Sequence, residues 1–478
     1  MHPKYKKQLV LILLFGLFLR VLFTLFGAEL YFGRSDFYYQ EDTYSYTQAA
    51  KNLIDYGSYK TSLDADNYST GRTPTYSLFI ALIYLISGKN MYIAMHLIMW
   101  IQVLLDTLCI ILLFSISRKL FNSQRLGLVI AGLYAIYPFV IFRTPLIASE
   151  SLGIILMIVS LYFFVKDKKY DYLISGIIIG AAILCKIQIA AIIPFMLVYI
   201  LITKLIIIKR HILHLVFFIL GLAIVYLPWP IRNYYITGDV VLTLRLGGEY
   251  ESIESDVLAF KQYINTVQSG FEPQLSQIVN GKSVDWPQKC YLSYEDSIKL
   301  RKAEYLSQNC GSGFRKYSTY WNKENHGFSG TESCNKEISS LFSELRAKQI
   351  EKYPFDYKVK VPLGNLKTAL LKSSLHDAPN KVISFLALGL FIFRSLLLLL
   401  GIFGIYFMIR HKLMFWIISS GFFLLLYYYI CFVTRNIEMR YLLPADVLML
   451  IPAAYLITIS YKWVAIKIQS RKPEHFKI

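Results

Sequence analysis

Runs of about 20 apolar residues recur along this chain and restrict its fold more than any other feature, since a helix of that length crosses the hydrocarbon core of a bilayer. The composition agrees with this interpretation. Of the 478 residues, 55% are hydrophobic and only 17% are charged, whereas an ordinary soluble domain carries about 25% charged residues. The sequence therefore predicts an all-α polytopic membrane protein.

The lysines and arginines are distributed in a way that orients the predicted spans. The net charge of +19 does not form the single patch that nucleic-acid binding requires, so no nucleic-acid partner is expected. The dense basic clusters lie instead at short loops, which the positive-inside rule assigns to the cytoplasm. The chain start is therefore expected inside. About ten spans follow, at 8–27, 94–117, 126–143, 147–165, 172–185, 188–203, 212–229, the later part of 382–409, 413–433 and 444–461.

The apolar piece 74–88 is too short for an ordinary span, with about 14 apolar residues. If it crossed the membrane, the basic cluster "SRKLFNSQR" after the next run would fall outside. We therefore expect 74–88 to lie in or on the outer leaflet, inside one long external loop at 28–93. This loop belongs to a predicted N-terminal transmembrane catalytic module at 1–231.

Residues 232–380 are polar and long enough for a small folded domain, which we expect outside the membrane, with a helix at 293–307. Residues 381–478 then supply the last membrane helices and a cytoplasmic tail. Cys290, Cys310 and Cys334 share the polar segment. In an oxidising compartment a pair among them can form a disulfide, and the sequence leaves all three pairings open. No Cys/His cluster with zinc-ligand spacing is present, so a structural zinc is not expected.

Once the spans are threaded, several unusual charged residues share the external face and lie beside helix ends. Ionisable groups so close to the bilayer are costly and indicate function. They are Glu41, Asp42, Arg72, Arg143, Glu150, Lys186, Arg232, Arg435, Glu438 and Arg440. Arg20 and Asp106, by contrast, lie within spans and are expected to be packing partners between helices.

Simpler interpretations of these charged residues remain open. Asp42 begins a stretch with helical spacing, so its side chain can act as an N-cap. Glu150 can be a carboxylate at a loop edge, Lys186 can extend its ammonium to the membrane interface, and Arg232 can be a membrane anchor. These interpretations account for each residue singly, and none of them accounts for the convergence on one face.

The combination of charges suits one kind of chemistry well. An external carboxylate can act as a general base on an acceptor hydroxyl. Neighbouring cations can hold an anionic leaving group, and arginine binds phosphate in a bidentate manner. A phosphate leaves without a general acid, so this set suits displacement at a sugar carbon that carries a lipid phosphate. A transporter for an anionic solute would show similar residues.

The motifs that carry these residues resemble the GT-C superfamily of polyprenyl-phosphate-sugar glycosyltransferases, in its protein-mannosyltransferase and aminoarabinose-transferase branch. The matching features cover most of 1–235 and the last external loop. Each is short, and their order and spacing make the resemblance specific. They are "EDTYSYTQAA", "GRTPTYSLF", "RKLF", "YP" followed by "SESL", "LCK", "PWPIRNYYITG" and "EMRYLLP".

The resemblance implies roles for individual residues. Asp42 matches the catalytic acidic position of the first loop, and Glu150 matches a second acidic position that places acceptor or a metal in relatives. Lys186 and Arg440 match positions suited to the lipid phosphate, and Arg72 begins the membrane-surface helix beside them. The supporting residues are Tyr46, Arg143, Arg232, Glu438 and Tyr441.

The sequence also departs from the family pattern. Relatives often carry Asp-Glu in the first loop, whereas here Glu41 precedes Asp42, so Glu41 has no secure counterpart and is assigned to acceptor or metal positioning beside Glu150. Thr75 stands where relatives often have glycine. The segment 232–380 matches no part of the family pattern. No cofactor is required by these motifs, and a divalent metal stays open.

Together these features predict an inverting glycosyltransferase that moves a hexosyl or pentosyl group from a polyprenyl-phosphate donor to an extracytoplasmic glycan, glycolipid or protein. The expected location is a bacterial cytoplasmic (inner) membrane, with the active site facing the periplasm or exterior and an envelope glycan such as O-antigen or lipopolysaccharide as acceptor. A lipid-linked sugar flippase or solute transporter is the alternative. It would need charged or broken helices at mid-membrane depth, whereas the clustered charges lie at one face.

Overall fold

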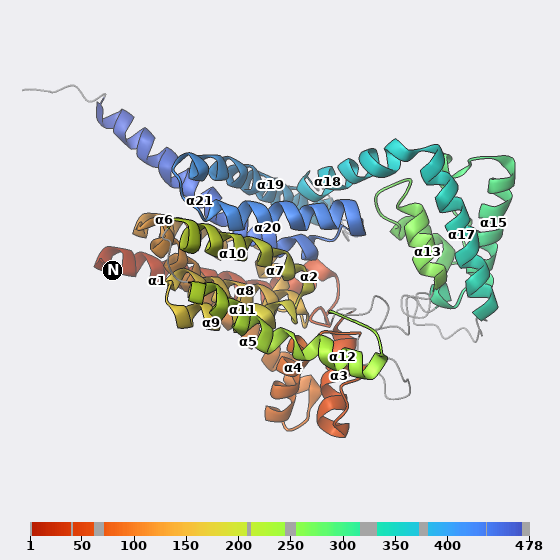
Figure 1. Cartoon of the computed structure of the whole chain (residues 1–478), viewed down its shortest axis with the longest axis horizontal. Helices are drawn as coiled ribbons and strands as arrows, with labels where there is room; N and C mark the ends of the chain where they lie inside the picture. Colours follow the sequence, from red (N-terminus) through yellow and green to blue (C-terminus); the bar gives the residue numbers. More distant parts are fainter. Residues whose placement is uncertain are drawn as a thin grey trace, which may run out of the picture.

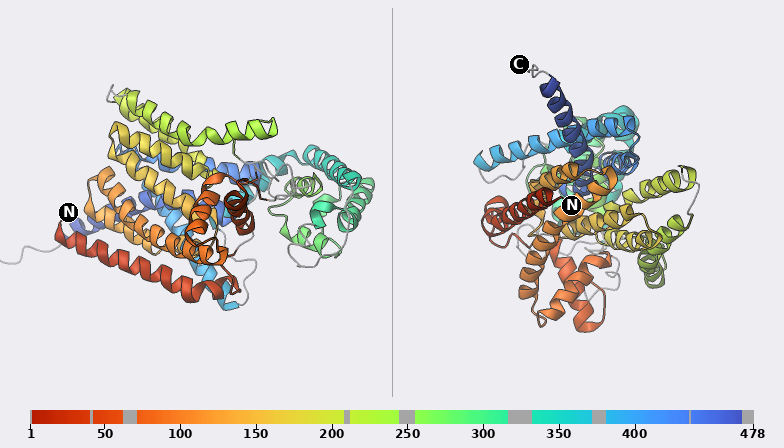
Figure 2. Two further views of the ribbon diagram at one scale, coloured as in Figure 1. Left: turned by 90° about the horizontal axis from the view of Figure 1, so that it is seen from below. Right: turned by 90° about the vertical axis from the view of Figure 1, so that its left-hand side faces the viewer.

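The computed structural model describes residues 2–39, 42–61, 71–207, 212–243, 255–315, 332–371, 381–435 and 437–470. Within these residues every regular element is a helix (Figure 1). The long helices run side by side as one bundle, and a smaller group of helices lies beyond one end of it (Figures 1 and 2). The predicted all-α polytopic fold is confirmed.

Eight helices of the described chain are long and apolar enough to cross a membrane. They are Pro3–Phe32, Met91–Phe121, Ser149–Lys166, Ile187–Lys204, Ile212–Thr237, Phe385–Arg410, Trp416–Thr434 and Met439–Val464. Two further helices that were expected to span are shorter, because α6 (Gln124–Ala135) has 12 residues and α9 (Lys169–Ile183) has 15. Both pack within the bundle, α6 against α5 (Met91–Phe121) and α9 against α8 (Ser149–Lys166) and α11 (Ile212–Tyr226).

Close packing of α9 against α11 depends on small residues. A Cβ placed on Gly176 would collide with the backbone of Phe218, and a Cβ placed on Gly221 would collide with the backbone of Leu173. In a bilayer, helices gain little from hiding apolar surface, so backbone contact through glycines is a main source of association. The two glycines therefore explain how the short helix α9 is held in the bundle.

Two buried networks of the same composition tie membrane helices together. Arg20 of α1 (Pro3–Leu22) donates from Nε to Oδ2 of Asp106 in α5 at 2.6 Å, and the Tyr134 hydroxyl of α6 donates to the same carboxylate. These three side chains lie out of contact with solvent, and each charge has a partner, as a charge inside a membrane protein requires. The expectation that Arg20 and Asp106 serve in packing between helices is confirmed, and the structure shows that they pair with each other.

The second network repeats this pattern in the C-terminal half. Arg394 of α19 (Lys381–Arg410) donates from Nε to Oδ2 of Asp446 in α21 (Met439–Ser470) at 2.6 Å. Tyr427 of α20 (Trp416–Tyr428) donates to Oδ1 of Asp446 at 2.6 Å. Arg394 Nη1 also donates to the carbonyl of Ala369, which joins α18 (Val361–Leu371) to the bundle.

Two shorter helices lie at the end of the bundle that carries the charged residues. The first is α3 (Thr43–Tyr56), and the second is α4 (Pro74–Ile86), so the apolar piece 74–88 does form a short helix. They pack on each other and on α5 through a buried cluster that includes Tyr46, Tyr76 and Ile98. Figure 1 draws both beside the lower edge of the bundle, close to α12 (Pro228–Thr237). Their depth in the bilayer stays a prediction.

The polar segment contains a compact helical unit with its own core. Its helices are α13 (Ser255–Ile264), α14 (Glu272–Val279), α15 (Tyr294–Asn309) and α17 (Glu332–Lys352), grouped at the right of Figure 1. Phe260, Tyr263, Trp286 and Phe342 pack in its centre. The helix expected at 293–307 is α15. Unlike these four helices, α18 packs against α19 and η7 (Tyr429–Thr434).

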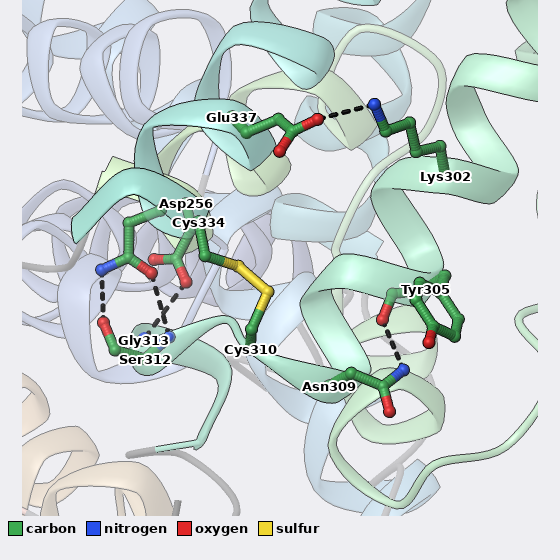
Figure 3. Close-up of a disulfide and its surroundings, with 10 residues drawn as sticks. Asp256, Lys302, Tyr305, Asn309, Cys310, Ser312, Gly313, Cys334 and Glu337 are labelled. Atoms are coloured by element: carbon green, nitrogen blue, oxygen red, sulfur yellow. Dashed lines mark hydrogen bonds and ion pairs between the residues drawn. A yellow bond between two sulfur atoms is a disulfide. The ribbon is translucent and has the colours of Figure 1, made fainter. Parts of the chain in front are cut away.

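A disulfide joins Cys310 to Cys334 and fixes the end of α15 to the start of α17 (Figure 3). Beside it the Gly313 amide donates to Oδ2 of Asp256 at 3.1 Å, which ties the segment after α15 to α13. Cys290 is a buried free thiol in the same core. Of the three pairings that the sequence left open, the structure contains the one that leaves Cys290 reduced.

Candidate functional site

Asp42 lies immediately before α3, with both carboxylate oxygens in ion pairs. Its Oδ1 accepts from Nη2 of Arg72 at 2.8 Å, and its Oδ2 accepts from Nη1 of Arg440 at 2.6 Å. The side chain makes no capping hydrogen bond to α3, although Asp42 occupies the N-cap position. The N-cap interpretation therefore does not describe this carboxylate, which faces two guanidinium groups instead.

The first turn of α3 fixes the guanidinium of Arg72 on the Asp42 side. Arg72 Nε donates to the Ser45 hydroxyl at 2.9 Å, and this hydroxyl in turn donates to the Asp42 carbonyl at 2.9 Å. The Arg72 guanidinium also lies 4.6 Å from the centre of the Tyr46 ring, in cation–π geometry. Tyr46 is buried and donates to the Ser149 hydroxyl at 3.1 Å. Two residues that the motifs did not single out, Ser45 and Ser149, therefore support the cluster.

Glu150 and Lys186 form a buried ion pair next to Asp42. Lys186 Nζ lies 2.6 Å from Glu150 Oε1, and the two side chains are 9% and 2% exposed. Glu150 lies in the first turn of α8, where the helix dipole favours a carboxylate. Lys186 lies between α9 and η3 (Ile187–Ile192) and points inward, so the interpretation that its ammonium extends to the interface is wrong. The second oxygen, Glu150 Oε2, has no hydrogen-bond partner among the described residues.

Arg440 connects the two ion pairs. It is the second residue of α21, and its Nη1 lies 3.9 Å from Glu150 Oε1 as well as 2.6 Å from Asp42. Its Nε pairs with Glu438 at 2.5 Å, and its Nη2 donates to the Tyr441 hydroxyl at 3.3 Å. The cluster therefore joins the first loop and α8 to the start of the last membrane helix.

The electrostatics of the cluster keep Asp42 ionised. Burial alone would raise its pKa, but the charges of Arg72, Arg440 and Lys186 outweigh burial and hold the pKa of Asp42 well below its usual range. Burial raises the pKa of Tyr46 well above the usual value for a phenol, so its hydroxyl is a donor at neutral pH. A site with three converging cations is suited to binding an anion, and its carboxylates keep those cations aligned when no anion is present.

Three predicted site residues lie outside this set of direct contacts or outside the described chain. Arg143 ends α7 (Pro138–Arg143), and its carbonyl accepts from the Ser151 hydroxyl in the first turn of α8. Its charge acts on Glu150 through space. Glu41 lies outside the described residues, so its position stays a prediction.

Arg232 supports the site from a distance. Its guanidinium lies 4.8 Å from the Trp229 ring and 5.4 Å from the Tyr59 ring, and it donates to the Tyr59 carbonyl. The Tyr59 hydroxyl donates to the carbonyls of Arg72 and Thr73 at 3.2 Å each. Arg232 thus braces the segment that presents Arg72. Tyr59 was missed by motif reasoning, and a lone tyrosine in a polar loop gives no signal of this role.

A divalent cation would need several oxygen or nitrogen ligands at one point. Among the described residues no group of three His, Cys, Asp or Glu gathers in a way that could hold a metal ion. The described carboxylates of the cluster, Asp42, Glu150 and Glu438, are all paired with cations.

The fold and the cluster together define a polytopic helical membrane protein with a buried site of carboxylates and cations where loops meet helix ends. Residues 71–229 match the family model described as Dolichyl-phosphate-mannose-protein mannosyltransferase. This match, which includes Arg72, Glu150 and Lys186, confirms the resemblance to the GT-C superfamily of polyprenyl-phosphate glycosyltransferases.

Among solved structures, an archaeal oligosaccharyltransferase and ArnT match this chain at low sequence identity. AglB from Archaeoglobus fulgidus, in complex with an inhibitory peptide and a dolichol-phosphate, is 12% identical, with a TM-score of 0.47 over 100% of this chain and 53% of that one. ArnT from Cupriavidus metallidurans bound to undecaprenyl phosphate is 14% identical, with a TM-score of 0.34 over 96% of this chain and 81% of that one. This chain thus spans about half the length of the archaeal enzyme. No curated protein matches the sequence significantly.

Proposed function

We propose that this protein is an integral membrane glycosyltransferase that transfers a sugar from a polyprenyl-phosphate donor to an extracytoplasmic hydroxyl acceptor. The observation that carries the proposal is the position of Asp42, which lies between Arg72 and Arg440 and next to the Glu150–Lys186 pair. A carboxylate beside three cations supplies both a base for the acceptor and a binding site for a phosphate.

The donor phosphate binds to Arg440 and Lys186 in this mechanism. Their charged groups both approach Glu150 Oε1, at 3.9 Å and 2.6 Å, so a phosphate oxygen can contact both. Arginine forms two parallel hydrogen bonds to a phosphate, which orients the donor as well as binding it. Arg72 remains on Asp42, held there by Ser45 and Tyr46.

Binding of the phosphate also makes Asp42 a better base. A carboxylate with two arginine partners has a low pKa and accepts a proton poorly, because general-base catalysis is most effective when the pKa lies nearer the working pH. When the phosphate draws Arg440 away, Asp42 keeps Arg72 and loses one of the charges that lower its pKa. The donor therefore prepares the base that its own transfer needs.

Transfer then proceeds as a single displacement. Asp42 accepts the proton of the acceptor hydroxyl while the hydroxyl oxygen forms a bond to the anomeric carbon. The bond between that carbon and the phosphate oxygen breaks, and the electron pair leaves with the polyprenyl phosphate, whose charge Arg440 and Lys186 neutralise. Attack opposite the leaving group inverts the anomeric configuration. Glu150, with a buried oxygen that lacks a partner among the described residues, lies where it can orient the acceptor.

The acceptor is proposed to be a bacterial envelope glycan or glycolipid of the O-antigen or lipopolysaccharide kind, reached from the periplasmic or outer face of the cytoplasmic membrane. The disulfide between Cys310 and Cys334 supports an oxidising compartment for the polar segment. The segment has its own core and a position beyond the end of the bundle, which suits it to acceptor recognition (Figure 1).

The experiment is a transfer assay with purified protein, radiolabelled polyprenyl-phosphate sugars and cell-envelope acceptors. Asp42→Asn should lower transfer by about 100-fold or more, the usual contribution of a general base. Asp36→Asn, at an exposed carboxylate paired with Arg34, is the matched control. Equal transfer by wild type and Asp42→Asn would overturn the assignment of the base. Movement of lipid-linked sugar across vesicles without any transfer would favour the flippase.

A further inference from the structure

A second cluster of cations lies at the opposite end of the bundle from Asp42. A cavity of about 400 Å³ opens there between the ends of α5 and α8 and the start of α9. Arg118 and Lys119 belong to the last turn of α5, Lys166 ends α8, and Lys168 precedes α9. Among the described residues, Asp171 is the one carboxylate that lines the cavity.

Helix α8 fixes the position of this cavity relative to the site. Glu150 lies in the first turn of α8 and Lys166 is its last residue. A helix rises about 1.5 Å per residue, so the 18 residues of α8 separate the two clusters by nearly the thickness of a bilayer core. The amide of His2 donates to Gln124 at the start of α6, which brings the chain start to this same end. The cavity therefore lies at the membrane face opposite the glycosyl-transfer site.

The four cations of this cavity form no ion pair among the described residues, in contrast to Arg20, Lys186 and Lys204. Within the described residues, no carboxylate lies within 4.0 Å of Arg118, Lys119, Lys166 or Lys168. Asp167, which lies between the two lysines in sequence, pairs with Lys204 at 2.6 Å and accepts from the Tyr172 hydroxyl.

A helix dipole favours a cation in the last turn of a helix. This preference explains the positions of Arg118, Lys119 and Lys166 one by one. The positive-inside rule explains the side of the membrane on which these cations lie, but neither preference explains why four cations from three segments line one cavity. The cavity wall is also partly apolar, because Tyr162 and Val165 line it beside the charges. The Lys166 ammonium lies 4.6 Å from the centres of the Tyr162 and Phe163 rings, which holds it at the rim.

We propose that this cavity binds the headgroup of an anionic glycerophospholipid from the leaflet at this face. Basic pockets between membrane helices recognise such headgroups, and each lysine or arginine near the surface strengthens the attraction. The phosphodiester would lie among Arg118, Lys119 and Lys168, and the glycerol and first acyl carbons against Tyr162 and Val165. A free phosphate shares the charge and lacks the apolar part, so it is the competing occupant.

The test is native mass spectrometry of the full chain in detergent, titrated with phosphatidylglycerol or phosphatidylcholine. The wild type should retain one phosphatidylglycerol and no phosphatidylcholine under the same activation. The triple variant Arg118→Gln, Lys119→Gln, Lys168→Gln should bind phosphatidylglycerol about 10-fold or more weakly. The matched control Lys4→Gln, Lys6→Gln, Lys7→Gln removes the same charge from the same end, away from the cavity, and should bind as wild type.

Three outcomes would overturn the proposal: equal retention by the wild type and the cavity variant, an equal loss in the control, or full displacement of the lipid by equimolar inorganic phosphate. Size exclusion and thermal unfolding check that the variants are folded. If the triple variant is not folded, Lys168→Gln alone removes an exposed side chain outside the helices and should weaken binding measurably, whereas Arg118→Lys keeps the charge and should retain the lipid. Sugar transfer is not the readout, so this test is independent of the proposed function.

Discussion

Arg440 and Asp42 are 398 positions apart in the chain, and Nη1 of the arginine lies 2.6 Å from Oδ2 of the aspartate. This pair brings the start of the last long helix onto the first loop. Arg440 also contacts Glu438 and Glu150, so a substitution of Arg440 changes more than its pair with Asp42. In the proposed mechanism a change at Arg440 therefore acts on the binding of the donor phosphate and on the basicity of Asp42 at once.

Arg440→Lys and Arg440→Gln should affect sugar transfer to different degrees. Lysine keeps the charge and loses the planar fork that contacts several oxygens, so we expect a raised KM for the lipid donor with a smaller change in kcat. Glutamine removes the charge and should lower kcat/KM by about 100-fold or more, as loss of a contact to a charged leaving group does. Steady-state kinetics with a polyprenyl-phosphate sugar measures both values. Lys412→Gln, at the other end of the bundle, is the control, and a KM unchanged in both Arg440 variants would contradict the role in phosphate binding.

The low pKa of Asp42 predicts a specific pH dependence of stability. Burial raises this pKa, but Arg72, Arg440 and Lys186 lower it below its ordinary value of 3.8. A carboxyl with a depressed pKa stabilises the fold above its unfolded pKa, and the stabilisation is lost as pH falls through the folded pKa. The difference in thermal stability between wild type and Asp42→Asn should therefore stay constant from about pH 7 to about pH 5 and shrink below about pH 4. A difference that already shrinks between pH 7 and 5 would contradict the paired state of Asp42.

The residues of the site could be predicted from sequence where topology alone brings them to one face. Asp42 lies in the loop after the first span, and Glu150, Lys186 and Arg440 lie at or just before the start of a span, so threading by hydrophobicity and loop charge was sufficient to gather them. The pairing could not be predicted, because which guanidinium meets which carboxylate depends on how α3 and α8 pack against α21. The role of Ser45 is invisible for the same reason, since a serine in a polar loop has no distinctive pattern.

The fold, like the site, could be predicted only in part. Hydrophobic runs near span length became long helices. The span expected at 126–143 was not continuous, since α6 ends at Ala135, because run length does not reveal where a backbone ends its helix. Helix α15 was predictable from its local pattern. The pairing of Cys310 with Cys334 was not, since it depends on the packing of α15 against α17.

The buried network around Asp446 should be important for stability rather than for transfer. Replacing Arg394 by leucine would leave the Asp446 carboxylate buried with only tyrosine donors, Tyr427 and Tyr137. Removing one partner of a buried ion pair costs about 3–5 kcal/mol, so a large drop in the apparent Tm is expected. The double variant Arg394→Leu, Asp446→Leu removes both charges and should recover part of the loss. A double variant less stable than Arg394→Leu would contradict this explanation.

Removal of the disulfide should destabilise the polar segment and leave the bundle intact. Cys310→Ser with Cys334→Ser opens a loop of 24 residues in sequence separation, and closing a loop of that size stabilises a fold by about 3 kcal/mol. Hydrogen exchange should then rise in α15 and α17 and stay unchanged in α5. Cys290→Ala, which alters a buried free thiol of the same core, is the control for loss of sulfur. Exchange that rises equally in both variants would contradict a specific role of the crosslink.

Arg435 should couple the polar segment to the site. Its backbone has a φ of 55°, in the left-handed region that non-glycine residues rarely adopt. Its guanidinium donates to the carbonyls of Asn265, at the end of α13, and Tyr357, both at 2.8 Å, and lies 3.9 Å from the Tyr357 ring. The side chain thus attaches the helical unit to the loop that leads to Arg440.

Arg435→Ala should therefore raise hydrogen exchange around 260–265 and 356–360 and reduce transfer through KM for the acceptor, with KM for the lipid donor little changed. Arg435→Lys keeps a charge but cannot contact both carbonyls in the same geometry, so it should rescue only part of the effect. Asparagine tolerates the left-handed backbone, so Arg435→Asn separates the contribution of the side chain from that of the backbone. Arg435 does not couple the polar segment to the site if Arg435→Ala changes kcat and both KM values in the same proportion, or if it leaves hydrogen exchange unchanged.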